Sequence, residues 1–220
     1  MTTATDHYHH GDLPNALRAA AVEVIKERGL GAFSLREVAR RAGVSHNAPA
    51  HHFGDMRGLL TSLAEEGFDA LCAAGQAAAA PYDDPVERLM ALGTAYVEVA
   101  RSHRAQFDVM FRLDLVDPDD PDLTAAGMRA YGVLEDTVRA VIESEALDVD
   151  LDDAAWLCWS AMQGLVVLEP KIARIGTLKG GDAVATPDLV RRFTGLIVAG
   201  MRSLSPTDAS TVTGGVGDRS

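Results

Sequence analysis

The segment Phe33–Leu60 reads FSLREVARRAGVSHNAPAHHFGDMRGLL, and its capping and turn residues outline two short helices. Ser34 and Glu37 have the spacing of a capping box, in which a serine hydroxyl and a glutamate carboxylate satisfy the first N–H groups of a helix. Gly43 predicts the end of that helix, because glycine adopts the left-handed conformation at little cost. Ser45 predicts the N-cap of the next helix. Two short helices joined by a glycine-containing turn indicate a helix-turn-helix.

Pro49 lies inside the second of these helices, where a proline is normally a helix breaker. With Ser45 as the N-cap, Pro49 is the fourth helical residue, so at most the first intrahelical hydrogen bond is lost. Val44 and Pro49 also have the spacing of a hydrophobic staple. We therefore expect this helix to form and to be short and stiff.

Helix signals continue on both sides of this motif. Asp12 and Pro14 predict the start of a first helix, and Gly29 predicts its end. Asp55 is placed to cap a long helix that follows the motif. These signals predict an N-terminal three-helix domain of the helix-turn-helix type over residues 11–60.

The remainder of the chain is also helical by pattern. Apolar residues at helical spacing and capping residues predict further helices over residues 84–103, 104–115, 123–145, 152–168 and 187–204. The predicted fold class is therefore all-α, with a helical-bundle regulatory domain over residues 61–204. The polar ends of the chain, residues 1–10 and 205–220, are expected to be disordered.

Charge is distributed unevenly along the chain, whose net charge is −12. Residues 1–60 hold seven Lys/Arg and six Asp/Glu, whereas residues 61–220 hold 13 and 26. Six of the seven histidines also lie before residue 54. The N-terminal domain is thus the part of the chain where contact with a polyanion costs least.

Several other classes of function are disfavoured. His51 and His52 are adjacent and point about 100° apart on a helix, so they cannot chelate one ion, and we expect no metal site. Neither a glycine-flanked serine elbow nor a phosphate-binding glycine loop occurs, so we expect no catalytic residues and no cofactor. Cys72 and Cys158 fit buried thiols of a cytoplasmic protein. No apolar run is long enough to predict a membrane span.

Polar side chains around the second helix of the motif are candidates for DNA contact. His46, Asn47 and His51 project from its exposed side, and short donors near a helix N-terminus suit the major groove. Arg36 can reach the same groove or a phosphate, and residues near helix N-termini suit phosphate oxygens. The candidate DNA-contacting residues are Ser34, Arg36, Ser45, His46, Asn47, His51, His52 and Arg57. The alternative is an ordinary polar surface with capping serines.

Three stretches, YHHGDL, FSLREVARRAGVS and HHFGDMRGLL, resemble the N-terminal domain of TetR-type transcriptional regulators from residue 8 to about residue 60. The resemblance implies binding to a double-stranded DNA operator. It implies base contacts from Arg36, His46 and Asn47, and phosphate contacts from His52 and the start of the fourth helix.

This chain departs from the family pattern at three positions. Ala50 and Met56 stand where the family often has a phosphate-contacting tyrosine and a lysine, so we expect few phosphate contacts, with His51 and Arg57 as the candidates to replace them. The stretches HRAQFDVMFR and WLCWSAMQGL resemble the subgroup whose C-terminal domain carries a Trp…His-Gly motif. Gln163 occupies the position of that histidine.

The acidic helical remainder resembles the family's ligand-binding and dimerisation domain. A pocket for an unidentified small apolar ligand is predicted at Tyr96, Phe107, Met110, Phe111, Trp156, Trp159, Met162 and Gln163. The helices predicted over residues 152–168 and 187–204 are the expected homodimer interface, and the second carries an apolar stripe that consists of Leu189, Phe193, Leu196, Ile197, Gly200 and Met201. The alternative for both sets is plain core packing.

The resulting functional hypothesis is a ligand-responsive repressor that binds a palindromic operator as a homodimer. One short recognition helix buries too little surface for tight specific binding, so two half-sites about 34–36 Å apart or somewhat more are expected. Two alternatives remain open. One is an activator of the same fold, and the other is a helical small-molecule-binding protein or enzyme whose DNA binding has degenerated.

Overall fold

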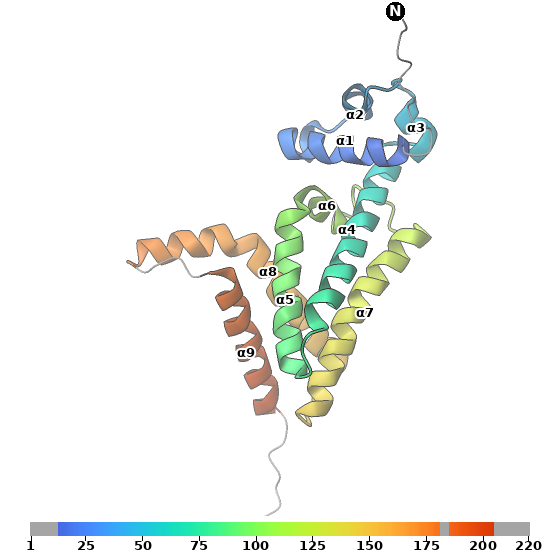
Figure 1. The fold of residues 1–220 in the computed structure, drawn as a ribbon. Helices are drawn as coiled ribbons and strands as arrows, with labels where there is room; N and C mark the ends of the chain where they lie inside the picture. Colours follow the sequence, from blue (N-terminus) through green and yellow to red (C-terminus); the bar gives the residue numbers. More distant parts are fainter. Residues whose placement is uncertain (1–12, 181–184, 205–220) are drawn as a thin grey trace, which may run out of the picture. The chain divides into compact units, whose positions relative to one another are not determined.

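The computed structural model describes residues 13–180 and 185–204, and within these ranges the chain forms helices without any strand (Figure 1). This confirms the predicted all-α fold. The segments 1–10 and 205–220, which we expected to be disordered, lie outside the described residues. None of the described helices is both long enough and apolar enough to cross a membrane.

The described helices pack as two compact units, each made of two stretches of chain. Unit 1 comprises the residues up to Ala73 together with Glu98–Tyr131, and unit 2 comprises Ala74–Val97 together with the residues from Gly132 onward. Three helices contribute to both units, namely α4 (Met56–Ala79), α5 (Pro85–Ser102) and α7 (Pro121–Ser144). The predicted boundary between functional domains after residue 60 stays a prediction.

Unit 1 is built around the N-terminal helices. Besides its parts of α4, α5 and α7 it contains α1 (Leu13–Arg28), the 3-10 turn η1 (Leu30–Ala32), α2 (Leu35–Ala42), α3 (Ala48–Phe53) and α6 (Arg104–Met110). Helical spacing of apolar residues on α1 leaves Leu17, Ala21 and Val24 with no exposed surface. Helix α1 packs against α2, α3 and α6. Burial of each such aliphatic side chain stabilises the fold by about 1.5–3 kcal/mol, and this stabilisation holds α2 and α3 against α1.

Both ends of α2 follow the local sequence, as predicted. The Ser34 hydroxyl accepts a hydrogen bond from the Glu37 N–H at 3.4 Å, which is one half of the capping box. At the other end Gly43 has φ 69°, and the Val44 N–H donates to the Ala39 carbonyl at 3.0 Å. A glycine is favoured there because other residues pay a steric cost at positive φ.

The start of α3 differs from the prediction. The helix begins at Ala48 with Asn47 as the N-cap residue, whereas we expected Ser45 in that role. The residues before Ala48 form a turn in which the Ser45 carbonyl accepts from the Ala48 N–H at 3.0 Å. Pro49 is therefore in the first turn of the helix, where its missing N–H costs nothing, and its ring is buried. The expectation of a short helix that tolerates Pro49 is confirmed.

The junction between α3 and α4 is tight. Asp55 caps α4, as predicted, because its Oδ1 accepts from the Gly58 N–H at 2.9 Å. A Cβ at Gly58 would lie 2.0 Å from the Phe53 carbonyl oxygen, so no other residue fits at this position. This close approach joins α3 directly to the long helix α4 that follows it.

Unit 2 contains α8 (Leu151–Leu178) and α9 (Thr186–Leu204), which pack against each other. Our predicted end of α8 at residue 168 is wrong, because the helix continues through Pro170. A proline removes one hydrogen bond and kinks a helix rather than always ending it, and Figure 1 shows a sharp bend in α8. The predicted helix over residues 104–115 is also too long, since α6 ends at Met110 and turns follow it.

Candidate nucleic-acid interface

The exposed polar surface of α2, α3 and the turn between them is the candidate for DNA contact. We call it the reading face, and it consists of Arg36, Ser45, His46, Asn47, His51 and His52, all of which are exposed. Pro49 and the half-buried Ala48 and Phe53 face the other way. His46 and Asn47 thus lie in the turn that leads into α3, at the N-terminal end of the recognition helix.

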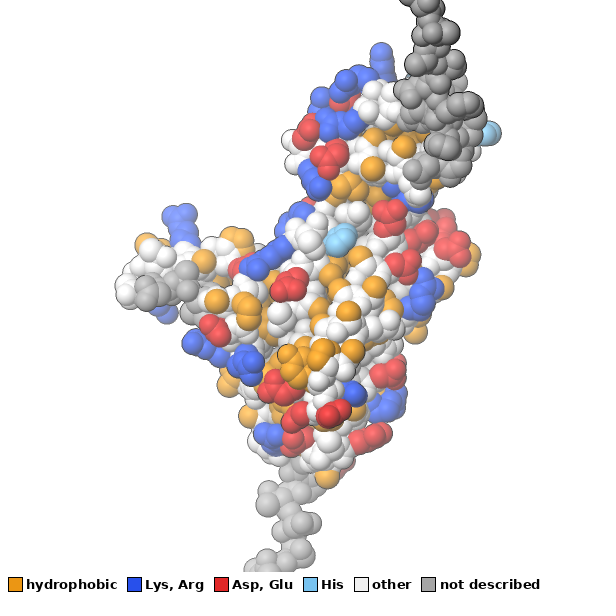
Figure 2. Space-filling view, in the orientation of Figure 1, with side chains coloured by type: hydrophobic (Ala, Val, Ile, Leu, Met, Phe, Trp, Pro, Cys, Tyr) orange, Lys and Arg blue, Asp and Glu red, His pale blue; other side chains and the backbone are white. Residues whose placement is uncertain are grey.

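Most cations near the reading face are already paired. The cations of α1 and α2 form the ion pairs Arg18–Glu66, Lys26–Glu23, Arg28–Glu37, Arg40–Glu37 and Arg41–Glu27. Arg36 differs from these residues, because it has no hydrogen-bond or ion-pair partner among the residues that the structure describes. Figure 2 shows Lys and Arg side chains gathered over this part of the molecule. Pairing leaves Arg36 as the cation of α2 that is available to a ligand.

The ion pairs of α2 are tightly made. Hydrogen bonding from Arg40, reinforced by the charges of Arg28 and Arg40, lowers the pKa of Glu37 to about 2. In the same way a hydrogen bond from Arg41 lowers the pKa of Glu27. Both carboxylates are therefore ionised at neutral pH and neutralise the arginines beside them.

Arg57 lies in the first turn of α4, as expected, but it has backbone partners that we did not expect, and its predicted phosphate contact stays a prediction. Its Nη1 donates to the Val116 carbonyl at 2.9 Å, and its Nη2 contacts the Asp114 carbonyl at 3.5 Å. One turn further along α4, the Thr61 hydroxyl accepts from the Asp117 N–H at 2.9 Å. Arg57 and Thr61 thus hold the segment after α6 against the start of α4. Local sequence carried no signal of this contact, because its partners are 57 and 59 residues away.

Ser34 and the two histidines of α3 stay accessible. The Ser34 hydroxyl is used as an acceptor by Glu37, so its proton is free to be donated to a phosphate oxygen. The rings of His51 and His52 lie 5.4 Å apart in an edge-to-face arrangement on the exposed side of α3. Met56 at the start of α4 is 43% exposed and offers no charge at the position where a lysine is frequent in the resembling family.

Part of the predicted ligand pocket forms one cluster in unit 2. The Tyr96 hydroxyl on α5 donates to Gln163 Oε1 at 2.5 Å, and the Trp159 Nε1–H donates to the Tyr96 hydroxyl at 3.2 Å. Met162 is buried, and burial raises the pKa of Tyr96, so its phenol is neutral. Trp156, which we also predicted to line the pocket, differs from these residues because its side chain is 54% exposed.

The other predicted pocket residues belong to unit 1. The rings of Phe107 and Phe111 are 5.4 Å apart, and Phe111 also meets Phe68 of α4 at 5.8 Å. Met110 is buried against Gly67 of the same helix. Phe107 is buried like Met110, and Phe111 is half-buried. Their role in a ligand pocket stays a prediction.

The predicted dimer stripe on α9 divides into two sides. Leu189 and Met201 are buried within their own chain, so they are not available to a partner, which corrects the prediction for these two residues. Leu196 is 72% exposed and Gly200 is exposed, while Phe193 and Ile197 are half-buried. The stripe spans more than one helix face, and α9 packs against α8.

Helix α8, which we expected to share the dimer interface with α9, carries exposed apolar residues that we did not name among the interface residues. This α8 face consists of Leu157, Val167, Leu168, Ile175 and Leu178, each at least 45% exposed. Their helical spacing could have shown it, but a stripe in sequence does not say which side is covered. Large exposed apolar patches mark protein interaction surfaces, so these side chains are candidates for such a surface.

Comparison with known proteins places these features in one family. A family model described as "Bacterial regulatory proteins, tetR family" matches residues 17–63, and one described as "Tetracyclin repressor-like, C-terminal domain" matches residues 89–172. The chain is 29% identical over 161 residues to the HTH-type transcriptional regulator CymR of Pseudomonas putida, spanning 69% of this chain and 76% of CymR. It is 29% identical over 153 residues to the class A tetracycline repressor protein from transposon 1721 of Escherichia coli, spanning 62% and 69% of the two chains.

A solved structure is also similar over nearly the whole chain. The structure of a protein with unknown function from Rhodococcus sp. RHA1 matches with a TM-score of 0.74 and 29% identity. The match covers 90% of this chain and 99% of that one. The first family model falls on α1 to α4, which are the helices that carry the reading face.

Proposed function

Because the chain belongs to the TetR family of bacterial DNA-binding transcriptional regulators, we propose that it is a cytoplasmic, ligand-responsive repressor that binds a palindromic operator as a homodimer. One observation carries the proposal, namely the exposed reading face, whose Arg36 has no partner among residues 13–180 and 185–204. The similarity to a tetracycline repressor supports repression rather than activation.

Base reading is assigned to Arg36, His46 and Asn47. An asparagine pairs with the adenine edge through two hydrogen bonds, and an arginine does the same with guanine. Asn47 and His46 stand at the N-terminal end of α3, which is the end that contacts bases in helix-turn-helix proteins. Ser34, Ser45, His51 and His52 surround them with donors suited to phosphates.

Few phosphate contacts are expected in the complex. Ala50 and Met56 bring no charge, Arg40 and Arg41 are paired with carboxylates, and Arg57 is engaged by backbone carbonyls. Each missing phosphate contact lowers the slope of log affinity against log salt concentration by about one. We infer that operator recognition in this protein depends on base contacts more than on charge.

Dimerisation is assigned to α8 and α9. The α8 face and the exposed Leu196 on α9 offer an apolar surface that water covers in a monomer. A second copy related by a two-fold axis would bury it and present two reading faces to one side of the duplex. The half-sites would then lie about 34–36 Å apart or somewhat more.

The effector site is assigned to the Tyr96 cluster. Its apolar surroundings and a small network of three polar groups are typical of a pocket for a largely apolar molecule. A ligand that inserts between Tyr96 and Gln163 must favour a conformation with lower operator affinity. The usual coupling of about 1–3 kcal/mol would lower that affinity roughly 5- to 150-fold.

Selection from random duplex DNA by the purified full-length chain tests the proposal. We expect an inverted repeat, and transcription in vitro from a promoter that carries this repeat should fall when the protein is added. An unpaired half-site would contradict the dimer, and a rise in transcript would identify an activator. The variant Asn47→Ala should lose selection at defined positions, whereas Arg139→Gln on α7 should select the same sequence.

A further inference from the structure

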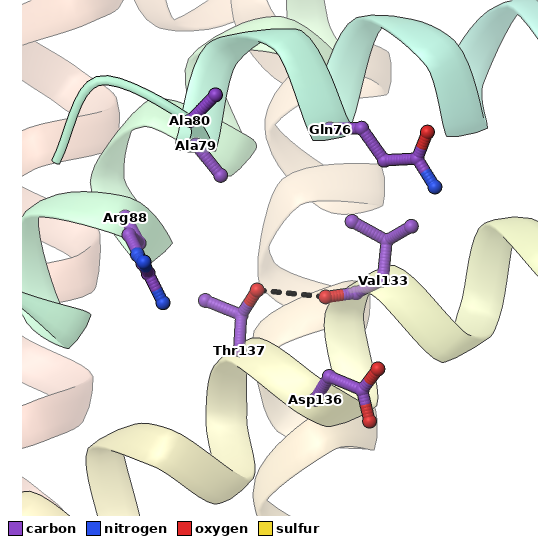
Figure 3. Close-up of a pocket in the computed structure, with 7 residues that line it drawn as sticks. All are labelled: Gln76, Ala79, Ala80, Arg88, Val133, Asp136 and Thr137. Carbon is purple, nitrogen blue, oxygen red and sulfur yellow. Dashed lines mark hydrogen bonds between the residues drawn. The ribbon is translucent and has the colours of Figure 1, made fainter. Parts of the chain in front are cut away.

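A surface hollow of about 300 Å³ lies in unit 2 between the end of α4, the start of α5 and α7 (Figure 3). Ala79 and Ala80 line it on the α4 side, and their small side chains leave the space open. Its volume is at the lower end of the range for small-molecule sites, so only a small ligand fits. Sequence patterns had not indicated this site.

Arg88 supplies a fixed positive charge on one wall. Its Nε donates to the Tyr82 carbonyl at 2.7 Å, which orients the guanidinium toward the hollow. No carboxylate pairs with Arg88 within residues 13–180 and 185–204. The two Nη groups therefore stay available, and paired N–H groups of this kind bind a carboxylate with two parallel hydrogen bonds.

The wall formed by α7 offers acceptors instead. Thr137 is buried, with 8% of its surface exposed. Its hydroxyl donates its proton to the Val133 carbonyl at 2.7 Å. Toward a ligand it can only accept. The exposed carboxylate of Asp136 lies beside it, and Gln76 adds an amide from α4 (Figure 3).

We propose that this hollow binds a small carboxylic acid that also carries an amino or hydroxyl group. The carboxylate would lie on Arg88, and the donor would lie on Asp136 and Thr137. A simple anion gains nothing from Asp136 and is repelled by it, while a simple amine is repelled by Arg88. A molecule with both groups satisfies both walls and leaves neither charge unpaired.

The hollow is separate from the Tyr96 cluster. Arg88 and Tyr96 are eight residues apart on α5, which corresponds to about 12 Å along the helix axis. The proposal therefore goes beyond the effector assigned above. Either site can fail its test without affecting the other.

Binding can be followed by nuclear magnetic resonance on the full-length chain, using the methyl groups of Ala79 and Ala80 and the side-chain amide of Gln76. The probes are β-alanine and lactate, with propionate and propylamine as controls that carry one group only. We expect saturable shifts of these signals with β-alanine or lactate at lower concentrations than with either control. Absence of saturation with both probes, or equal binding of propionate, would overturn the proposal.

Two variants test the assigned roles. Arg88→Gln should weaken binding of the better probe about 10- to 100-fold, which is the usual effect of losing a charge-assisted hydrogen bond. Asp136→Asn should weaken that probe but not propionate, which has no donor. Arg139→Gln is the matched control, because Arg139 pairs with Glu135 at 2.7 Å on α7 and does not line the hollow. Unchanged binding by Arg88→Gln, or equal loss in the control, contradicts the site.

Discussion

Replacing Arg57 by alanine separates a structural role of this residue from a DNA-contacting one. The bond from Nη1 to the Val116 carbonyl is 2.9 Å long and partly buried, whereas the contact to the Asp114 carbonyl is 3.5 Å long. A hydrogen bond from a charged donor contributes about 1.5–3 kcal/mol, and the longer contact adds little. Because Arg57 is exposed, we expect Arg57→Ala to lower the free energy of unfolding by about 1.5–2 kcal/mol. For a chain of this size, that is a fall of roughly 3–8 °C in Tm.

Urea unfolding followed by circular dichroism measures this loss, and a salt titration of DNA binding measures the other role. Arg36→Ala is the matched control, since Arg36 is exposed and unpartnered in the described residues and its loss should change the unfolding free energy by less than about 0.5 kcal/mol. If Arg57→Ala is as stable as the parent and its salt slope is lower by about one, Arg57 is a phosphate contact and the structural assignment is wrong.

Four further outcomes follow from the geometry. Asn47→Ala should cost about 1–3 kcal/mol at particular base pairs and little at others, which a panel of single-base operator variants would show. Leu196→Glu, at a 72% exposed position, should shift the dimer toward monomer in analytical ultracentrifugation without lowering helix content. Tyr96→Phe removes the bond to Gln163, so it should change the ligand response but leave operator affinity without ligand unaltered, as measured by fluorescence anisotropy. Because pairing lowers the pKa of Glu37 from 4.5 to about 2, its contribution to stability is present above pH 4.5 and is lost as the pH falls toward 2. Unfolding midpoints of Glu37→Gln should depend less on pH over that interval than those of the parent.

Local capping chemistry explains why several helix ends were predictable. Ser34 and Asp55 satisfy N–H groups within three residues of themselves, and Gly43 relieves a steric conflict at its own φ. These interactions involve neighbours in sequence, so they can be recognised without knowledge of the fold. Ser45 has the same chemistry, yet it is not the cap of α3 because the residues after it form a turn.

Exposure of the reading face could also be predicted, but which arginines near it are paired could not. Arg36 is a polar residue opposite the apolar side of α2, so periodicity alone places it outward, whereas His46 and Asn47 lie in the turn before α3, and short polar turns usually lie at the surface. Whether an arginine is free depends on what reaches it from another helix. Arg41 meets Glu27 of α1, and Arg57 meets the backbone after α6.

The amino-acid sequence specified the all-α class, most helix ends and the location of the recognition helix, because these depend on periodicity and on hydrogen bonds between near neighbours. Packing settled the rest. Tertiary packing determines which side of α9 is buried and places Arg88 and Thr137 in the lining of one hollow. It also allows α8 to continue through Pro170. Each of these outcomes depends on surfaces distant in sequence, and their free energy is determined by the neighbours that the folded chain supplies.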